Sequence, residues 1–228
     1  MDYKNSKGPR KNLIVPRSPS RQKSEREVAR LLNAIHDFYQ KGWVPATGGN
    51  FSVLLSSSPF RLAITTSGID KKALHKNQIL TVDAGGRVIQ GHGKASAETG
   101  IHLTLIQECG AKAIFHTHSV WGTTLSQIYA SRGGFYLEGY EMLKALRGVK
   151  THTHREWLPI IENSQDISLL SSKAREVLRQ YPRSHGFLTR GHGLYTWGSD
   201  LTEAKRHVEA LEFLLEVFGR TRSTRSRT

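Results

Sequence analysis

The 228-residue sequence predicts an α/β domain with a central mixed, largely antiparallel sheet and helices on its faces. Short apolar runs bounded by Gly, Ser, Thr and Asp indicate strands. They lie between segments whose apolar residues recur every three or four positions, which is typical of helices. The two kinds of segment do not form a regular strand–helix–strand repeat, so an all-parallel sheet is not expected.

The elements can be placed in chain order. Ser24 and Glu27 form a capping box that begins the first helix, which ends near Gly42. Asp200 and Glu203 form a second capping box, which begins the last helix. Between them we expect helices over 97–109, after Ser119, around 140–147 and over 167–180, and strands within 46–55, 60–68, 78–91, 113–118, 157–162, 186–190 and 193–197.

The net charge of +14 is concentrated at the chain ends: residues 1–26 carry +6 and residues 219–228 carry +4. We therefore expect a basic, flexible tail at 1–23, a folded domain at 24–219 and a basic tail at 220–228. Such tails can attract RNA, acidic proteins or membranes, but solvated extensions are expected here. The folded body does not have the charge of a nucleic-acid-binding protein.

The single cysteine, Cys109, excludes an internal disulfide framework and a zinc site with several cysteines. No apolar run approaches the roughly 20 residues that span a bilayer. The N-terminal sequence lacks the apolar core of a signal peptide. We therefore expect a cytoplasmic protein with no membrane contact.

Two histidines stand two residues apart in the apolar stretch AIFHTHSVWG. Side chains alternate between the faces of a strand, so His116 and His118 point to one side and Thr117 to the other. The pair could hold a metal, act in catalysis or be core histidines with backbone partners. A catalytic zinc has three protein ligands. His192 is a candidate third ligand, since it stands between two glycines that permit a tight turn and a close approach.

Other histidines are weaker candidates. His152 and His154 repeat the two-residue spacing, and His92 also stands between glycines, but both segments are polar and loop-like. The remaining histidines are expected to be surface groups or core groups with satisfied hydrogen bonds: His36, His75, His102, His185 and His207.

Three Gly/Ser/Thr segments favour an anion site: TGGN at 47–50, TTSG at 65–68 and GKASAE at 93–98. In the absence of a P-loop, backbone N–H groups of glycine-rich turns and hydroxyls bind phosphate. Each segment alone is typical of an ordinary turn. Glu98 and Glu141 are candidates for proton transfer, although the residues alone favour a helix-dipole partner for Glu98 and a solvated helical acid for Glu141.

Six motifs occur in the order found in the class II aldolase/adducin superfamily: ATGGNFSV, ITTSGIDK, AIFHTHSVWG, YEMLKAL, WLPIIEN and RGHGLYTWG. The chain resembles this superfamily over residues 24–219, and YEMLKAL with LPIIEN resembles its dehydratase branch. The resemblance implies a three-layer α/β/α catalytic domain. It also implies a homotetramer with active sites near subunit interfaces, where a neighbouring subunit can supply site residues.

The resemblance further implies one zinc ion per subunit, held by His116, His118 and His192. It implies Glu141 as general acid/base and Glu98 as an auxiliary acid–base group. The implied phosphate-binding residues are Gly49, Asn50, Ser67, Gly68 and Ser96. The sequence Ser96-Ala97-Glu98 lacks the second serine of the family motif, and Thr99 stands where related dehydratases can carry a cysteine.

The implied reaction is zinc-dependent dehydration of 5-methylthioribulose 1-phosphate to 2,3-diketo-5-methylthiopentyl 1-phosphate in L-methionine salvage. The nearest alternative is a class II sugar-phosphate aldolase or a pentulose-phosphate 4-epimerase with the same metal and phosphate site. A non-catalytic, adducin-like scaffold is expected to lack the histidines. A nucleic-acid-binding protein would depend on the two basic tails.

Overall fold

The computed structural model describes residues 19–225 and contains nine strands in one sheet. The strands are β1 (Asn50–Ser57), β2 (Phe60–Thr65), β3 (Ile79–Val82), β4 (Val88–Gln90), β5 (Ala113–Thr117), β6 (Gly134–Glu138), β7 (Arg155–Ile161), β8 (Gly186–Thr189) and β9 (Gly193–Gly198). Their order in the sheet is β4-β3-β2-β1-β5-β9-β8-β7-β6. Every neighbouring pair is antiparallel except β7 and β8, which confirms the predicted mixed, largely antiparallel sheet.

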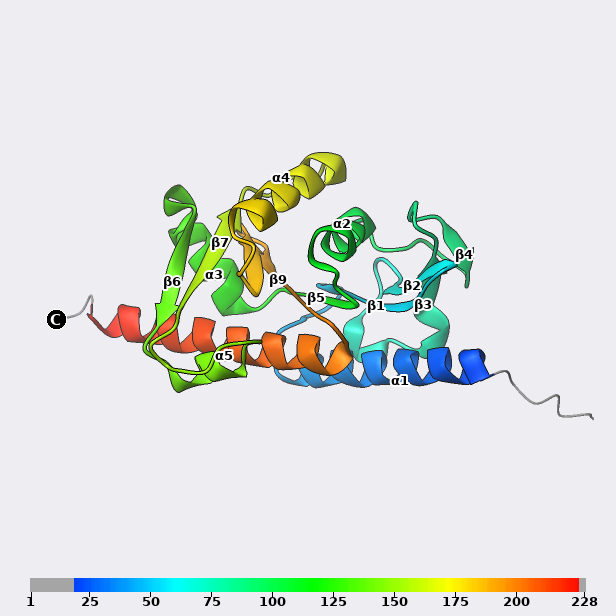
Figure 1. The fold of residues 1–228 in the computed structure, drawn as a ribbon, viewed down its shortest axis with the longest axis horizontal. Helices are drawn as coiled ribbons and strands as arrows, with labels where there is room; N and C mark the ends of the chain where they lie inside the picture. The colour runs from blue at the N-terminus through cyan, green and yellow to red at the C-terminus, as the bar shows by residue number, and fades with distance from the viewer. Residues whose placement is uncertain (1–18, 226–228) are drawn as a thin grey trace, which may run out of the picture.

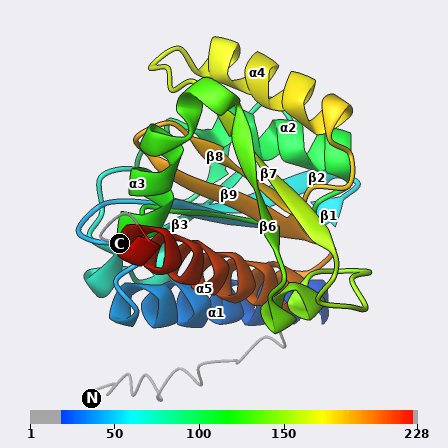
Figure 2. The same ribbon diagram turned by 90° about the vertical axis from the view of Figure 1, so that its left-hand side faces the viewer.

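Helices cover both faces of this sheet. The α-helices are α1 (Pro19–Gln40), α2 (Thr99–Cys109), α3 (Val120–Ile128), α4 (Ile167–Gln180) and α5 (Leu201–Arg225), and short 3₁₀ helices are η1 (Lys71–Ala73), η2 (Lys76–Gln78), η3 (Ala130–Arg132) and η4 (Glu141–Ala145). Helices α1 and α5 run along one side of the molecule, and α2 and α4 lie on the opposite side (Figures 1 and 2). The domain therefore has the three layers of an α/β/α fold.

Strand β5 shows how the sheet divides its side chains between the two helical layers. Ala113 and Phe115 pack with α1 and α5. Ile114 packs with α2 and α4. This alternation places His116 on the α2/α4 side, and Thr117 on the α5 side, where its Oγ1 donates to the Glu212 carboxylate.

The first capping box is wrong. Helix α1 begins five residues earlier, at Pro19, and Ser24 lies inside it, with its Oγ donating to the Ser20 carbonyl at 3.1 Å. The second cap is confirmed, because Asp200 Oδ1 accepts from the backbone N of Glu203 at 2.8 Å.

The predicted tails fall only partly within the described residues. Residues 19–23 belong to α1, and residues 220–225 belong to α5, so both segments are helical. Residues 1–18 and 226–228 lie outside the described part of the chain. Within 19–225, no helix combines the length and apolar character needed to cross a membrane.

Two predicted helices differ from the structure at positions that concern the site. Helix α2 begins at Thr99 rather than 97, with Glu98 as its N-cap, and ends at Gly110, whose φ of 63° is left-handed. The helix predicted around 140–147 is the short η4. The helix after Ser119 is confirmed as α3, since Ser119 Oγ accepts from the backbone N of Gly122 at 3.0 Å.

Candidate active site

The end of β5 and the turn between β8 and β9 bring three histidines together. His116 pairs with Tyr195 across β5 and β9, and His118 follows the end of β5. His192 stands in the β8–β9 turn, where its backbone carbonyl accepts from Thr123 Oγ1 of α3 at 2.9 Å. The triad therefore lies at one end of two central strands.

Two glycines allow this turn to form. Gly191 has a φ of 60°, in the left-handed region that suits glycine. A Cβ on Gly193 would lie 1.9 Å from the carbonyl oxygen of Thr117, so no other residue permits this approach of β9 to β5. The backbone therefore confirms both the tight turn and the close approach that were predicted from the glycines around His192.

The ring nitrogens of the triad converge. His116 Nε2 lies 2.8 Å from His118 Nε2 and 3.3 Å from His192 Nε2. Nδ1 of His116 lies 3.0 Å from the Leu194 carbonyl, to which it donates, so its Nε2 carries the lone pair. Among residues 19–225, these three side chains form the one cluster of potential ligands close enough to share a metal ion.

This donor set fits a metal ion. Nitrogens that lie 2.0–2.1 Å from a tetrahedral zinc are about 3.3 Å apart, which matches the His116–His192 separation, while the His116–His118 pair is closer. Nδ1 of His192 is buried and has no hydrogen-bond partner in the described part of the chain. Lone pairs of neutral rings that face one another repel, and a cation between them removes that repulsion.

The surroundings favour neutral rings. Burial, and then the neighbouring His192, hold the pKa of His116 well below its usual range. Burial, and then His116, lower the pKa of His118 to about 3. Neutral imidazole is the form that binds metals, so burial prepares these side chains as ligands.

Glu98 is the carboxylate beside the triad. Its Oε2 lies 3.5 Å from His116 Nε2, and its Oε1 lies 3.7 Å from His192 Nδ1. Although Glu98 is the N-cap residue of α2, its side chain makes no cap hydrogen bond. It instead accepts from the side-chain amide of Asn50, which pairs with His116 across β1 and β5.

The residues predicted to bind phosphate line the same cavity as two histidines of the triad. This cavity measures about 370 Å³ and contains Glu98, His118 and His192 in its wall. Its wall also includes all five predicted phosphate-binding residues: Gly49, Asn50, Ser67, Gly68 and Ser96. The three Gly/Ser/Thr segments therefore meet at one place, although at least 14 residues separate each from the next in the sequence.

Sequence reasoning missed four polar side chains in this wall: Lys71, Asn163, Ser164 and Gln165. Lys71 is almost fully buried, and its Nζ donates to the carbonyls of Thr47 at 2.9 Å and Ile69 at 3.0 Å. Burial lowers the pKa of this lysine to about 8. Two signals were available in the sequence: Lys71 ends the motif ITTSGIDK, and it follows the TTSG turn by three residues.

Glu141 is not in this cavity. It begins η4, where its side chain is 68% exposed and contacts Lys144 and His152. Lys144 lowers the pKa of Glu141. Strand β6 is antiparallel to β7, and the end of β7 is paired with β8 beside the triad, so η4 follows the far end of β6. Within one chain, Glu141 and the triad therefore lie at opposite ends of these strands.

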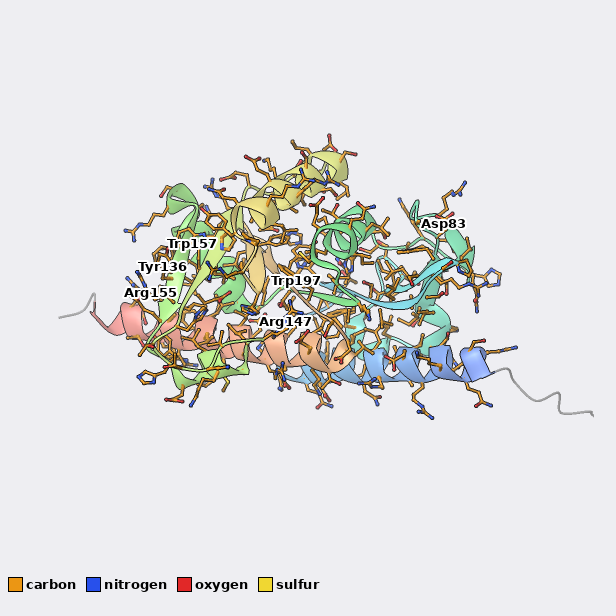
Figure 3. All side chains as sticks on the ribbon, viewed as in Figure 1. Asp83, Tyr136, Arg147, Arg155, Trp157 and Trp197 are labelled. Atoms are coloured by element: carbon orange, nitrogen blue, oxygen red, sulfur yellow. The ribbon has the colours of Figure 1, made fainter. Side chains whose placement is uncertain are left out.

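The weaker histidine candidates are also elsewhere. His152 is exposed beside Glu141, and His154 Nε2 lies 2.8 Å from Glu156 Oε2. A second cavity, of about 540 Å³, has His154, Arg147 and Trp197 in its wall; Figure 3 labels the last two. In this wall Arg147 pairs with Glu203, and His154 and His185 both contact Glu156, whereas the triad presents converging ring nitrogens, so we place the candidate site at the triad.

The Class II Aldolase and Adducin N-terminal domain family matches residues 29–218. The chain belongs to this family. Two members with the name methylthioribulose-1-phosphate dehydratase are similar to it. The Marinobacter nauticus protein is 41% identical over 189 residues, which cover 82% of this chain and 89% of the relative. The Methylococcus capsulatus protein is 43% identical over 194 residues, which cover 85% of this chain and 93% of the relative.

Solved structures of class II aldolases share the fold. An L-fuculose 1-phosphate aldolase has a TM-score of 0.73 at 21% identity, with 87% of each chain covered. The L-fuculose-1-phosphate aldolase of Thermus thermophilus has a TM-score of 0.71 at 24% identity, with 90% of this chain and 98% of the aldolase covered. These likenesses confirm the class II aldolase-like fold that the sequence motifs imply.

Proposed function

We propose that the protein is a zinc-dependent methylthioribulose-1-phosphate dehydratase, a hydro-lyase of L-methionine salvage. One observation carries the proposal: Glu98, His118 and His192 line one cavity with the glycine and serine segments suited to phosphate, and the buried His116 lies directly beside Glu98. The identity of 41–43% to dehydratases over more than four-fifths of the chain supports this substrate.

His116, His118 and His192 would hold the metal, one ion per subunit. When bound, zinc supplies Lewis-acid stabilisation of negative charge on the C2 and C3 oxygens, which acidifies the C3 proton. The tautomer of His116 suits this role, since its Nδ1 donates to the Leu194 carbonyl and its Nε2 stays free to bind.

The phosphate would lie among Gly49, Asn50, Ser67, Gly68 and Ser96. Lys71 adds a positive charge to the same wall. Fixing the phosphate at C1 orients the rest of the chain of the substrate toward the triad, where C2 and C3 must lie. This anchor restricts the reaction to phosphorylated sugars.

Glu98 is the carboxylate that accepts the C3 proton in this proposal, because it is the acid nearest the triad within one chain. As the C3–H bond breaks, its electrons delocalise onto the C2 carbonyl as an enediolate, and they then form the C3–C4 double bond as the C4 hydroxyl leaves. The departing oxygen takes a proton and becomes water. The enol product then ketonises to 2,3-diketo-5-methylthiopentyl 1-phosphate.

Glu141 would donate the proton to the C4 oxygen from a neighbouring copy of the chain. Its exposure, outside the cavity of its own chain, supports an intermolecular role. We propose a homotetramer in the cytoplasm, with sites between subunits. The large exposed apolar side chains Val120 and Ile128 on α3 support association.

The test is incubation of metal-analysed protein with 5-methylthioribulose 1-phosphate. One product that keeps all the carbons and is a diketone is expected. Cleavage into a short ketone phosphate and a second fragment would indicate an aldolase instead, and an unchanged substrate would overturn the proposal. His116→Ala should lose both metal and turnover, whereas His152→Ala, the matched change at the other H-x-H pair, should keep both.

A further inference from the structure

A chain of hydrogen bonds runs from β1 through α2 to the carboxylate beside the triad. Ser52 Oγ lies 2.7 Å from Nδ1 of His102, and Nε2 of His102 lies 2.5 Å from Oδ1 of Asn50. Nδ2 of Asn50 donates to Glu98 Oε2. Ser52, His102 and Asn50 are all buried, so water does not compete for these bonds.

The spacing of the residues explains why the chain forms. Asn50 and Ser52 are two apart on β1 and share one face of the sheet, with Asn50 paired to His116. Glu98 and His102 are four apart, so α2 places them one above the other. The amide of Asn50 lies between these two side chains and bonds to both.

The bonds have one consistent direction. Burial lowers the pKa of His102 to about 4, so its ring is neutral and has one N–H. The amide oxygen of Asn50 can only accept, so Nε2 of His102 is the donor. Nδ1 then carries a lone pair and accepts from the Ser52 hydroxyl. Each group in the chain donates toward Glu98.

We propose that His102 is a positioning residue that fixes the orientation of the Asn50 amide and so holds Glu98 beside the triad. The inference rests on the proposed function, in which Glu98 accepts the C3 proton. Without the Nε2–H of His102, the Asn50 amide is free to rotate its oxygen toward Glu98. Two acceptors would then face each other, and the Glu98 carboxylate would move away from His116.

Two substitutions at His102 separate this role from simple core packing. His102→Gln places an amide nitrogen near the position of Nε2 and keeps a donor for Asn50. His102→Asn reaches only the position of Nδ1, so it keeps a partner for Ser52 and loses the donor for Asn50. We expect His102→Asn to lower kcat about 10- to 100-fold with KM changed less than about twofold. His102→Gln should keep most of the wild-type kcat. Equal loss in both variants would overturn the proposal.

His207, on α5 beside the end of β9, provides a matched control away from the triad. It is also a buried histidine with both nitrogens bonded, to the Trp197 carbonyl at 2.7 Å and to the backbone N of Arg147 at 3.1 Å. His207→Asn should lower thermal stability as His102→Asn does, while kcat stays unchanged. A comparable fall of kcat in the folded His207 variant would assign the effect to general loss of packing, against the proposal.

A double-mutant cycle tests whether His102 acts through Glu98. In a Glu98→Gln background, His102→Asn should cause no further loss of kcat, because the group that it positions is already changed. Independent, multiplicative losses would overturn the proposal. If Glu98→Gln by itself leaves turnover unchanged, the catalytic role of Glu98 fails, and the positioning proposal fails with it.

A spectroscopic measurement tests the hydrogen-bond chain without any activity. In ¹⁵N–¹H correlation spectra of metal-free protein, the His102 signals, identified by their loss in His102→Gln, should show a neutral ring protonated at Nε2. A ring protonated at Nδ1, or at both nitrogens, would overturn the proposed direction of the chain. If the ring is protonated at Nε2 but the protein has no dehydratase activity, the hydrogen-bond chain is correct and the proposed function is wrong.

Discussion

The imidazole ring of His116 lies flat on the phenol ring of Tyr195, with centroids 3.9 Å apart and planes 7° apart. The two residues are partners across β5 and β9. The stack fixes the plane of the imidazole, and the bond from its Nδ1 to the Leu194 carbonyl fixes its rotation. His116 therefore presents Nε2 to the site in one orientation.

Loss of the Tyr195 ring should weaken metal binding. Tyr195→Leu removes the stacking surface, and we expect about a tenfold lower affinity for Zn²⁺, as for the loss of other groups that orient a ligand. Tyr195→Phe keeps the ring and should bind Zn²⁺ within about twofold of wild type. Competition with a chelating dye measures both affinities on folded protein. Equal affinity of the Leu and Phe variants would show that the stack does not orient His116.

Local patterns in the sequence were sufficient for much of the fold and for the outline of the site. Strand alternation predicted that His116 and His118 share a side, and their Nε2 atoms lie 2.8 Å apart. Glycines marked the turn of His192. These features depend on neighbours in the chain, which a single sequence displays. The capping box at Ser24 failed because Ser24 lies inside α1, where its hydroxyl donates to the Ser20 carbonyl of the preceding turn.

Features that depend on distant segments could not be predicted. His102 is a buried core histidine, as expected, but its link to Glu98 passes through Asn50, which lies on another strand. Lys71 stands in a polar loop with no periodicity to show that it is buried. Glu141 was assigned to the site by its motif, and no spacing within one chain reveals which subunit's site it serves.

Lys71 should strengthen phosphate binding. Its buried ammonium shares the cavity wall with Ser67 and Ser96, and a hydrogen bond to a charged group contributes about 1.5–3 kcal/mol. Lys71→Met should therefore weaken inorganic phosphate binding at least about tenfold at pH 7 in calorimetric titrations. The exposed neighbour provides the control, since Lys72→Met should bind phosphate like wild type.

The same lysine predicts a pH dependence. Burial lowers the pKa of Lys71 to about 8 in the folded protein, so above pH 8 it loses the charge that attracts phosphate. Phosphate affinity of the wild type should fall between about pH 8 and pH 9. Affinity of Lys71→Met should change little over this range, and a parallel fall in both proteins would contradict the assignment.

Glu212 should make stability depend on pH. It is buried under β5, where Thr117 and Ser119 bond to its carboxyl, and burial raises its pKa from 4.5 to about 7. The folded state therefore holds this proton more tightly than the unfolded state does. Its contribution to the free energy of unfolding is complete below pH 4.5 and is lost as the pH rises through 7. The total loss is about 3 kcal/mol.

Glu212→Gln removes the titrating carboxyl. The free energy of unfolding should therefore depend less on pH between 4.5 and 7 in this variant than in wild type. Chemical denaturation of metal-free protein at a series of pH values measures the difference from wild type, in which the titrations of other groups cancel. Glu209→Gln changes an exposed acid on the same helix, paired with Lys41, and should leave the curve unchanged. Identical pH profiles for Glu212→Gln and wild type would show that Glu212 does not titrate in this window.

Glu141 should act on the triad of a second chain. Glu141→Gln should lower kcat about 10²- to 10⁴-fold, as expected for loss of a general acid, with metal content unchanged. His116→Ala should be inactive for a different reason, the loss of metal. If Glu141 serves the site of its neighbour, mixed oligomers of the two variants contain sites built from an intact triad and an intact Glu141. In a ring of equally mixed chains about a quarter of the sites are of this kind, so activity should return on co-refolding. If the mixed oligomers are no more active than the separate variants, Glu141 either has no part in the reaction or acts in the site of its own chain.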